Sequence, residues 1–319
     1  MSKPDTTLLH ASSLFDLKGV VAVVTGRSTG IGLHIATTLA INGATVYIVR
    51  LDEEQVVKTA GKWNELMRVE QPQSRGKGAG SLKGLKGDCG SKWPGRGEAT
   101  GEAGGGEGRL CHRVVNNAGV PGKGPTKVPP TAISSRSIYF DKLDEQDFYD
   151  AYRVNSIGPY FLSTAFLPLL VASKTKAPYG NKFLPTIVNT ASMNAWTKDP
   201  ATAGLGIPYI LSKASMGVMT ALLAHEIVPL GVRVNAIAPA LFASGMTRPG
   251  MVDEWGRSTI EAKDVGSTAL MLLVNSFITG ETVLVDGGCL LAIVFSVQLE
   301  RSYCGFFLGS LLTFVEYGT

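Results

Sequence analysis

Tyr209 and Lys213 are the two residues whose types and spacing most directly suggest chemistry. They are four positions apart, so a helix places both on one face. A phenol has an unperturbed pKa of about 10, which makes it a poor acid–base catalyst at neutral pH. A neighbouring ammonium favours the phenolate, so we expect Lys213 to lower the pKa of Tyr209. Tyr209 can then protonate a carbonyl oxygen or deprotonate an alcohol, while Ser192 hydrogen-bonds the same oxygen.

A glycine-rich turn from Thr25 to Gly32 offers a place for phosphate groups. It follows Val20–Val24, a wholly apolar run typical of a strand buried on both faces, and it opens a helix-like stretch. Glycines let the backbone approach a pyrophosphate, and a helix N-terminus supplies free N–H groups. The spacing here is Gly-x-x-x-Gly-x-Gly rather than Gly-x-Gly-x-x-Gly. A simple strand-to-helix turn is the alternative interpretation.

Alternating strands and helices must position these groups. The predicted strands are Val20–Val24, Thr45–Val49, a weak third strand before Asp88, Arg113–Val115, Thr186–Thr190, Val232–Ile237 and Thr282–Val285. The predicted helices include one from about Asp52 and those over Asp144–Ala172, Tyr209–Ile227 and Glu261–Val274. This alternation predicts a single doubly wound α/β Rossmann domain with a seven-stranded parallel sheet, rather than two domains.

Further landmarks follow in the order of a known family. Asn116-Asn-Ala-Gly119 follows a strand, Asn155 lies in a predicted helix, and Ser192 ends a strand. Tyr209-Ile-Leu-Ser-Lys213 comes 17 residues after that serine, and Asp286-Gly-Gly288 closes the last strand. A lone Tyr-x-x-x-Lys arises by chance in about one of every two proteins of this size, so only the joint order carries weight. The chain thus resembles the short-chain dehydrogenase/reductase family over roughly residues 17–290.

The resemblance implies an oxidoreductase that interconverts a carbonyl and a secondary alcohol by hydride transfer. It implies that Lys213 also holds the nicotinamide ribose and that Asn155 anchors a water in a proton relay. The implied catalytic residues are Asn155, Ser192, Tyr209 and Lys213. The implied cofactor-binding residues are Gly26, Ser28, Gly30, Ile31, Gly32, Arg50, Asp88, Asn116, Ala118, Gly119, Tyr209, Lys213 and Pro239. Within the family the ending resembles 3-oxoacyl-carrier-protein reductases, and the resemblance further implies a homodimer or homotetramer through the helices containing Asn155 and Tyr209.

Cofactor choice depends on the residue that ends the second strand. An acidic residue there accepts the ribose 2′-OH of NAD and repels a 2′-phosphate. The first polar residue here is Arg50, which can pair with a 2′-phosphate, and Arg27 adds positive charge. We therefore expect NADP(H) rather than NAD(H). In the alternative, Arg50 is solvated and Asp52 contacts the ribose. Separately, Asp88 resembles the family's acidic residue near the adenine.

The segment from Gly76 to Gly108 breaks the pattern, with 13 glycines in 33 residues. Seven glycines and Pro94 fall where a helix should cover the sheet between strands three and four. At about 1 kcal/mol per glycine and about 3 for proline, a helix here would lose on the order of 10 kcal/mol relative to alanine. We expect that helix to be disrupted. Because the length is preserved while the pattern is lost, a local reading-frame error is our hypothesis, which an intact frame in the resequenced transcript would refute.

Three parts of the chain are predicted to differ in organisation. Residues 1–16 form a polar arm, 17–290 the NAD(P)-binding domain, and 291–319 an apolar tail without a counterpart in the pattern. The tail fits read-through into non-coding sequence, a partner-binding arm or a peripheral membrane element. Exposed apolar segments of that kind favour aggregation.

Composition excludes several other classes. The 319 residues are 45% apolar with a net charge of +4, enough for a sizeable core and without the clustered basic face of nucleic-acid binders. The four cysteines and four histidines show no disulfide framework or metal-ligand spacing, so no metal and a reducing, cytoplasmic location are expected. No stretch reaches the length of a confident membrane span.

Two other functions compete with a carbonyl reductase or alcohol dehydrogenase. A non-catalytic dinucleotide-binding or scaffold protein would explain the damaged segment, as would a defective gene product without a stable fold. Every catalytic position is filled, which favours the enzyme. The preferred partner is therefore a small carbonyl or alcohol substrate, with no nucleic acid.

Overall fold

The computed structural model describes residues 6–26, 30–50, 52–70, 80–86, 110–123, 131–176, 183–197, 206–240, 242 and 261–290. Its strands are β1 (Val21–Thr25), β2 (Thr45–Arg50), β3 (Ser81–Lys86), β4 (Arg113–Asn116), β5 (Thr186–Thr190), β6 (Arg233–Pro239) and β7 (Thr282–Val285). Its helices are α1 (Ala11–Leu14), α2 (Ile31–Ile41), α3 (Glu53–Glu70), α5 (Ala132–Tyr139), α6 (Glu145–Tyr152), α7 (Gly158–Lys176), α9 (Gly206–Ile227) and α10 (Ala262–Val274). Short turns are η1 (Thr6–Leu9), η3 (Arg153–Ile157), η4 (Met193–Ala195) and η5 (Val228–Leu230).

The strands form one seven-stranded sheet in the order β3-β2-β1-β4-β5-β6-β7. Every neighbouring pair is parallel. The order reverses between β1 and β4, as expected for a doubly wound sheet that places ligands beyond the carboxyl ends of its strands. The predicted fold class, including the seven strands, is confirmed.

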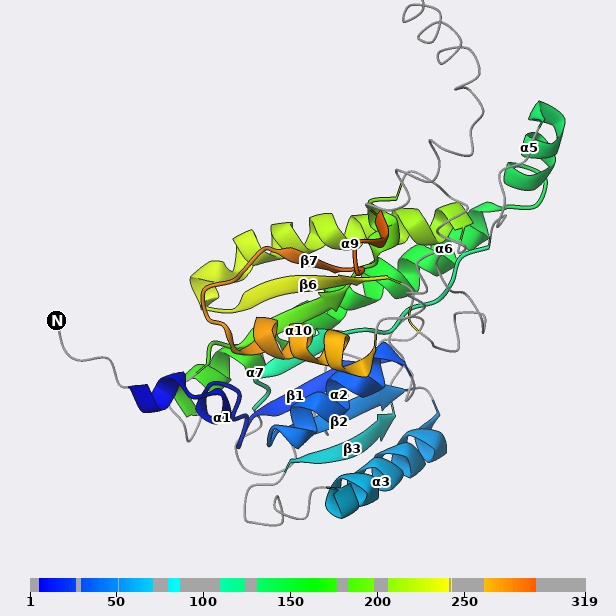
Figure 1. Cartoon of the computed structure of the whole chain (residues 1–319). Coiled ribbons are helices and arrows are strands. Elements are labelled where there is room, and N and C mark those ends of the chain that lie inside the picture. The colour runs from blue at the N-terminus through cyan, green and yellow to red at the C-terminus, as the bar shows by residue number, and fades with distance from the viewer. Residues whose placement is uncertain are drawn as a thin grey trace, which may run out of the picture.

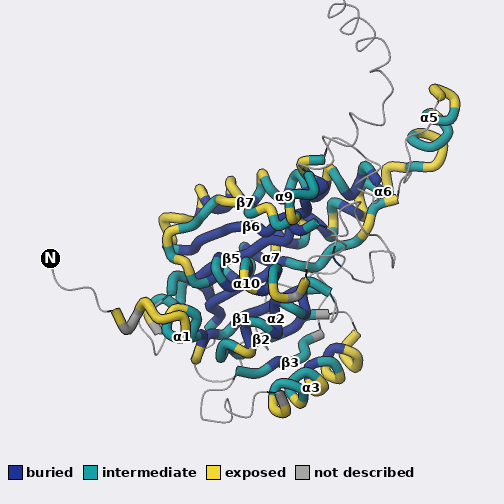
Figure 2. The backbone as a smooth tube through the Cα atoms, viewed as in Figure 1, coloured by how far each residue is buried: buried dark blue, intermediate teal, exposed yellow. Residues whose placement is uncertain are grey.

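Two helical layers cover the sheet (Figure 1). Helices α2, α3 and α10 pack on one face, where the largest core cluster includes Ile35, Val56 and Leu272. Helices α7 and α9 pack on the other face, where Phe166, Ile187 and Leu223 share a second cluster. The central strands are the most completely buried part of the chain (Figure 2). Burial on both faces explains why these strands are continuous apolar runs in the sequence.

Close packing explains part of the glycine-rich segment. A Cβ at Gly84 of β3 would lie 2.8 Å from the Val57 backbone nitrogen of α3, so only glycine fits there. On the outer edge of β3, the Asn64 amide accepts from the Leu82 N–H and donates to the Leu82 carbonyl, both at 2.8 Å. The weak third strand thus forms, held by α3. The helix that we expected to be disrupted falls on residues 87–109, outside the described residues.

The predicted helix over Asp144–Ala172 contains a break in its hydrogen-bond pattern. Helix α6 passes into α7 through the π-type turn η3, which contains Asn155. A π turn inserts one residue into the helical ladder, and such turns are frequent at functional sites. The hydrophobic period does not reveal it. Helix α5, capped by Thr131 and Ser134, was not predicted and buries none of its residues.

Two helical stretches, Glu145–Thr175 and Gly206–Leu230, are long and apolar enough by composition to cross a membrane. In the structure both lie against the sheet or its neighbouring helices, with 39% and 44% of their most apolar windows buried. Their apolar character is that of core helices in this fold.

Candidate functional site

The four predicted catalytic residues gather beyond the carboxyl end of β5. Ser192 follows that strand and begins η4, Tyr209 and Lys213 lie on the first turns of α9, and Asn155 lies in η3. Their exposed fractions are 0% for Asn155, 6% for Ser192, 5% for Tyr209 and 3% for Lys213. Four polar residues from three separate elements are therefore buried together.

The Tyr209 side chain is hydrogen-bonded to the Ser192 side chain. Burial raises the pKa of Tyr209, and the hydrogen bond to Ser192 offsets only part of this rise. This direction is opposite to our expectation that Lys213 lowers the pKa of Tyr209. The reason is geometric: the Lys213 ammonium nitrogen lies 5.9 Å from the phenol ring centre and is directed at a backbone carbonyl.

Lys213 is anchored to the strand that carries Ser192. Its Nζ donates to the Thr190 carbonyl oxygen at 2.6 Å. Burial lowers the pKa of Lys213 to about 8, because the charged form loses its hydration. The Thr190 carbonyl is a contact that sequence reasoning missed, since a backbone acceptor leaves no mark in a motif.

Asn155 connects η3 to two other parts of the site. Its amide nitrogen donates to the Val120 carbonyl at 3.0 Å and to the Ser212 hydroxyl at 2.9 Å. Its amide oxygen accepts from the Val120 N–H at 2.8 Å. Ser212 was missed although it stands inside the Tyr-x-x-x-Lys motif. This network ties the segment after Asn116-Asn-Ala-Gly119 to the helix that carries Tyr209.

The glycine turn packs against the loop after β4. Gly26 has φ +118°, and a Cβ there would lie 2.5 Å from the Asn117 amide nitrogen. That amide donates to the Thr25 carbonyl at 3.1 Å, while the Thr25 hydroxyl accepts from the Asn117 and Ala118 N–H groups at 3.1 and 3.2 Å. A Cβ at Gly32 would also collide with the Asn117 amide. Gly26 and Gly32 therefore make room for Asn117, a role that our phosphate argument did not include.

Among the described residues, the first amides of α2 have no side-chain cap. Gly30 is the N-cap residue with φ +70°, and no described side chain hydrogen-bonds the turn that begins at Ile31. Uncapped helix N–H groups carry partial positive charge and suit a phosphate. Ser28 and Arg27 fall outside the described residues.

Asn116 differs from the other predicted cofactor residues. Its side chain is 1% exposed and donates to Asn189 at 2.8 Å and to Ser163 at 2.9 Å, inside the packed interior. Gly119 approaches the catalytic group closely, because a Cβ there would lie 3.2 Å from the Asn155 amide oxygen and 3.6 Å from Lys213 Nζ. Pro239 ends β6 at the same carboxyl edge.

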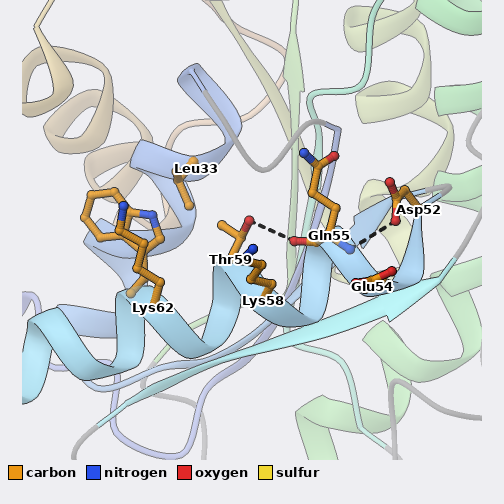
Figure 3. A pocket seen from close by; sticks show the side chains of 8 residues that line it. Leu33, Asp52, Glu54, Gln55, Lys58, Thr59 and Lys62 are labelled. Atoms are coloured by element: carbon orange, nitrogen blue, oxygen red, sulfur yellow. Dashed lines mark hydrogen bonds between the residues drawn. The ribbon is translucent and has the colours of Figure 1, made fainter.

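The end of β2 lies beside an open cavity of about 550 Å³ (Figure 3). The lining residues are Leu33 from α2 and Asp52, Glu54, Gln55, Lys58, Thr59, Lys62 and Trp63. None of the predicted catalytic residues lines it. Arg50 ends β2, but the structure does not describe its side chain, and Asp88 falls outside the described residues.

The sequence also suggests a substrate loop over roughly 241–258, which contains Phe242, Met246, Met251 and Trp255, and this stretch lies almost wholly outside the described residues. Phe242 is 6% exposed and its ring lies 5.2 Å from that of His34 on α2. It belongs to the core cluster, and core packing was an alternative to a role in a substrate pocket or a mobile lid. In the described part of the chain, no three histidine, cysteine or acidic side chains gather as metal ligands.

A parallel sheet with a glycine turn opening its first long helix is the architecture of dinucleotide-binding α/β proteins. A family model described as enoyl-(acyl carrier protein) reductase matches residues 111–289, more than half of the chain, and one described as short chain dehydrogenase matches residues 20–74. The chain belongs to the short-chain dehydrogenase/reductase family, and it is therefore an oxidoreductase of the class that acts on CH–OH groups with NAD(P). Neither match covers residues 75–110, where the glycine-rich segment lies.

Known proteins are similar over most of their length. The short-chain dehydrogenase/reductase PhomF of Diaporthe leptostromiformis is 32% identical, over 90% of this chain and 97% of its own. The 3-ketoacyl-(acyl-carrier-protein) reductase of Brucella melitensis, solved with NADH, is 26% identical with a TM-score of 0.66. The match covers 85% of this chain and 98% of the reductase. Pseudomonas aeruginosa RhlG, solved with NADP, has a TM-score of 0.68 at 24% identity over 86% and 98%, a likeness of fold.

Proposed function

We propose that this chain is an NADP(H)-dependent oxidoreductase that interconverts a carbonyl and a secondary alcohol, with Tyr209 as general acid and base. The observation that carries the proposal is the hydrogen bond between the Tyr209 and Ser192 side chains, with Lys213 on the same helix face. Two hydroxyl groups that meet in this way can both contact one substrate oxygen. The bound cofactor supplies or accepts the hydride.

Each side chain has a role at that oxygen. Tyr209 donates its proton to the carbonyl oxygen during reduction and removes it from the alcohol in the reverse reaction. Ser192 hydrogen-bonds the same oxygen and stabilises its negative charge. Because its pKa is about 8, Lys213 can be charged or neutral near physiological pH, so it can take part in the movement of that proton.

We assign Asn155 the role of holding a water in the proton path. Its side chain bridges Val120 and Ser212 with no exposed surface, and its amide oxygen lies close to Gly119, which in turn lies close to Lys213. Asn155 lies in the π turn η3, so its side chain is directed differently from one in a regular α-helix.

The residues at the start of α2 fit a dinucleotide phosphate. The uncapped amides after Gly30 supply donors, and Gly119 leaves open the space that a Cβ would fill beside Lys213. Gly26, Gly32 and Ala118 contribute backbone around this turn, and Ile31, Ser28 and Pro239 complete the proposed set. For Asn116 the packing supports a structural role, since its side chain binds Asn189 and Ser163.

We propose NADP(H) over NAD(H), selected by Arg50. The cavity beside the end of β2 adds Lys58 and Lys62 to the positive charge there, although Asp52 and Glu54 line it as well (Figure 3). Arg50→Asp should therefore weaken NADPH binding more than NADH binding. Equal loss of both nucleotides would assign the selection to another residue.

We further propose a cytoplasmic homodimer or homotetramer built on α7 and α9. Large apolar side chains stand exposed on these helices, among them Phe161 at 54% and Leu222 at 61%. Patches of this kind mark interfaces. Light scattering should give a particle mass that is a multiple of the chain mass. Leu222→Arg, which puts a charge on the proposed interface, should lower that particle mass.

The deciding experiment titrates the full chain with NADPH and NADH, following melting temperature, and then assays a carbonyl panel that includes a 3-oxoacyl thioester. A saturable shift that is larger with NADPH, together with turnover, supports the proposal, because a ligand that binds only the folded state stabilises it. A clean melt without a nucleotide shift would favour a scaffold protein. The absence of a cooperative melt would mean that the chain does not fold stably.

A further inference from the structure

Two arginines are buried in one row across the sheet, at the edge opposite the catalytic residues. Arg113 begins β4 and Arg233 begins β6, and both align in register with Thr186, which begins β5. Residues aligned across parallel strands project to the same face of the sheet. The exposed fractions of the two arginines are 1% and 3%. Neither arginine takes part in the proposed reaction.

Arg233 is well supplied with acceptors. Its Nη1 donates to the Leu272 and Ile278 carbonyls at 3.0 and 2.8 Å. Its Nη2 donates to the Thr186 hydroxyl at 2.5 Å and to the Leu273 carbonyl at 3.3 Å. Two of these carbonyls belong to the last turn of α10, where the helix dipole is negative. Only its Nε has no partner among the described residues.

Arg113 has much less support. Its Nη1 donates to the His112 carbonyl at 2.8 Å, and its guanidinium carbon lies 5.6 Å from the ring centre of Phe183. Within the described part of the chain, its Nε and Nη2 are buried without any hydrogen-bond partner. A guanidinium carries only donors, so these groups can be satisfied only by an acceptor.

Among the described residues, no negative charge near Arg113 balances it. Burial first, and then the charge of Arg233, lower the pKa of Arg113 to about 9. Beside it, burial raises the pKa of Cys111 to about 12 and lowers the pKa of His112 to about 4, so both are neutral at physiological pH. In the segments that the structure describes, no carboxylate forms an ion pair with either arginine. An unpaired buried charge is strongly destabilising.

We propose that Arg113 and Arg233 form a binding site for a small oxyanion of the phosphate or sulfate class. Neighbouring strands lie about 4.8 Å apart, so the Cα atoms of the two arginines, on either side of Thr186, are about 10 Å apart. Arg113 offers Nε and Nη2, the pair of donors that binds an oxyanion with two parallel hydrogen bonds. Arg233 offers its Nε. This site is independent of the proposed oxidoreductase reaction.

The test follows the melting temperature of the full chain while sodium phosphate or sodium sulfate replaces sodium chloride at constant ionic strength. We expect a saturable rise of about 5 °C in the wild type. Calorimetric titration with inorganic phosphate should then show a site that Arg113→Met lacks. Arg113→Met should abolish the saturable rise, and in chloride it should melt at or above the wild-type temperature because the unpaired charge is gone.

Two further variants separate this site from general salt effects and from a simple effect of charge. Arg136→Met removes an arginine whose side chain is 73% exposed, and it should keep the full phosphate response. Arg113→Lys keeps the charge without the paired donors, and it should reduce the response. A wild type that does not respond to phosphate, or a response that survives in Arg113→Met, would overturn the proposal. If Arg113→Met fails to fold, selenate soaked into wild-type crystals must show an anomalous peak between the two arginines, and its absence would overturn the proposal as well.

Discussion

The two edges of the parallel sheet both bury positive charge, but they satisfy it in different ways. At the carboxyl edge, Lys213 donates to the Thr190 carbonyl, and burial lowers its pKa to about 8. At the amino edge, Arg113 keeps two unpartnered groups within the described structure. A lysine can release its proton when buried, whereas an arginine does not in practice. The carboxyl edge can therefore change its charge during a reaction, while the amino edge requires an anion.

The polar side chains of the two edges also differ in how they are held. Asn155 and Lys213 each contact backbone carbonyls from neighbouring segments, so the site is tied to η3, β5 and the loop after β4. At the amino edge, His112 accepts from the Val21 N–H through Nδ1 at 3.0 Å and is buried in its neutral form. The first arrangement positions groups for chemistry, and the second fastens β4 to β1.

The largest expected effect tests whether the carboxyl edge performs proton transfer. Tyr209→Phe removes only the hydroxyl, so we expect kcat to fall about 10²- to 10⁴-fold while NADPH binding is kept. The measurement is steady-state kinetics on the carbonyl that the panel identifies, with a parallel NADPH titration. Tyr160→Phe, an exposed tyrosine on α7, is the matched control and should keep full activity. Wild-type turnover by Tyr209→Phe would remove Tyr209 from the mechanism.

The next largest effect concerns the contribution of the Asn155 hydrogen bonds to stability. Asn155→Ala deletes three hydrogen bonds and leaves the Val120 N–H and carbonyl without this partner. We expect the free energy of unfolding to fall by about 2–4 kcal/mol, because buried groups lose their partners. Gln146→Ala, which removes an exposed bond to Asp150, should change it by less than about 0.5 kcal/mol. Equal losses in the two variants would contradict the central place of Asn155.

A smaller effect tests the cost of the buried lysine. Because the pKa of Lys213 is lowered to about 8 on folding, the penalty for its charge is fully present below pH 8 and disappears as the pH rises toward the unfolded value. Lys213→Met should therefore be more stable than the wild type at pH 7, by about 1–3 kcal/mol. Urea unfolding at pH 7 and pH 9.5 should show this advantage shrinking at the higher pH. A constant difference would mean that the charge of Lys213 is compensated.

The smallest effect concerns the amino edge. His112 is neutral in the folded protein, with a pKa lowered to about 4, so its contribution is present above about pH 6.5 and is lost as the pH falls toward 4. His112→Asn keeps an acceptor for the Val21 N–H but cannot titrate. We expect the wild type to lose about 1 kcal/mol more stability than this variant between pH 6.5 and pH 4.5, as measured by urea unfolding. Parallel curves for the two proteins would refute the assignment.

Much of the fold was predictable because periodicity reports burial directly. The strands Thr186–Thr190 and Thr282–Val285 have the predicted bounds, and the helix with Tyr209 and Lys213 begins only a few residues earlier than expected. The four candidate catalytic residues were named from the resemblance to the family, which rests on the order and spacing of its landmarks, and the fold buries all four beyond the carboxyl end of β5. The π turn at Asn155 escaped prediction because it changes the hydrogen-bond ladder without changing the apolar pattern.

Predictions failed where the property depended on direction in space. The pKa of Tyr209 is raised because the helix buries the phenol and turns the Lys213 ammonium toward Thr190. Helical spacing shows that two side chains share a face but not where their charges point. For Asn116 the cofactor contact stays a prediction; what the sequence did not show is that its side chain packs into the interior with Asn189, which lies 73 positions away.

By itself, the sequence determined the class of fold and the chemical groups available to it. Short continuous apolar runs, helical apolar periods between them and glycines at the turn predict a doubly wound sheet, since each pattern suits one way of burying side chains. Only the tertiary structure decided which groups are buried against which partners. Hydration, charge and hydrogen bonding depend on neighbours distant in sequence, and so the register that aligns Arg113 and Arg233 with Thr186 is visible only once β4, β5 and β6 lie side by side.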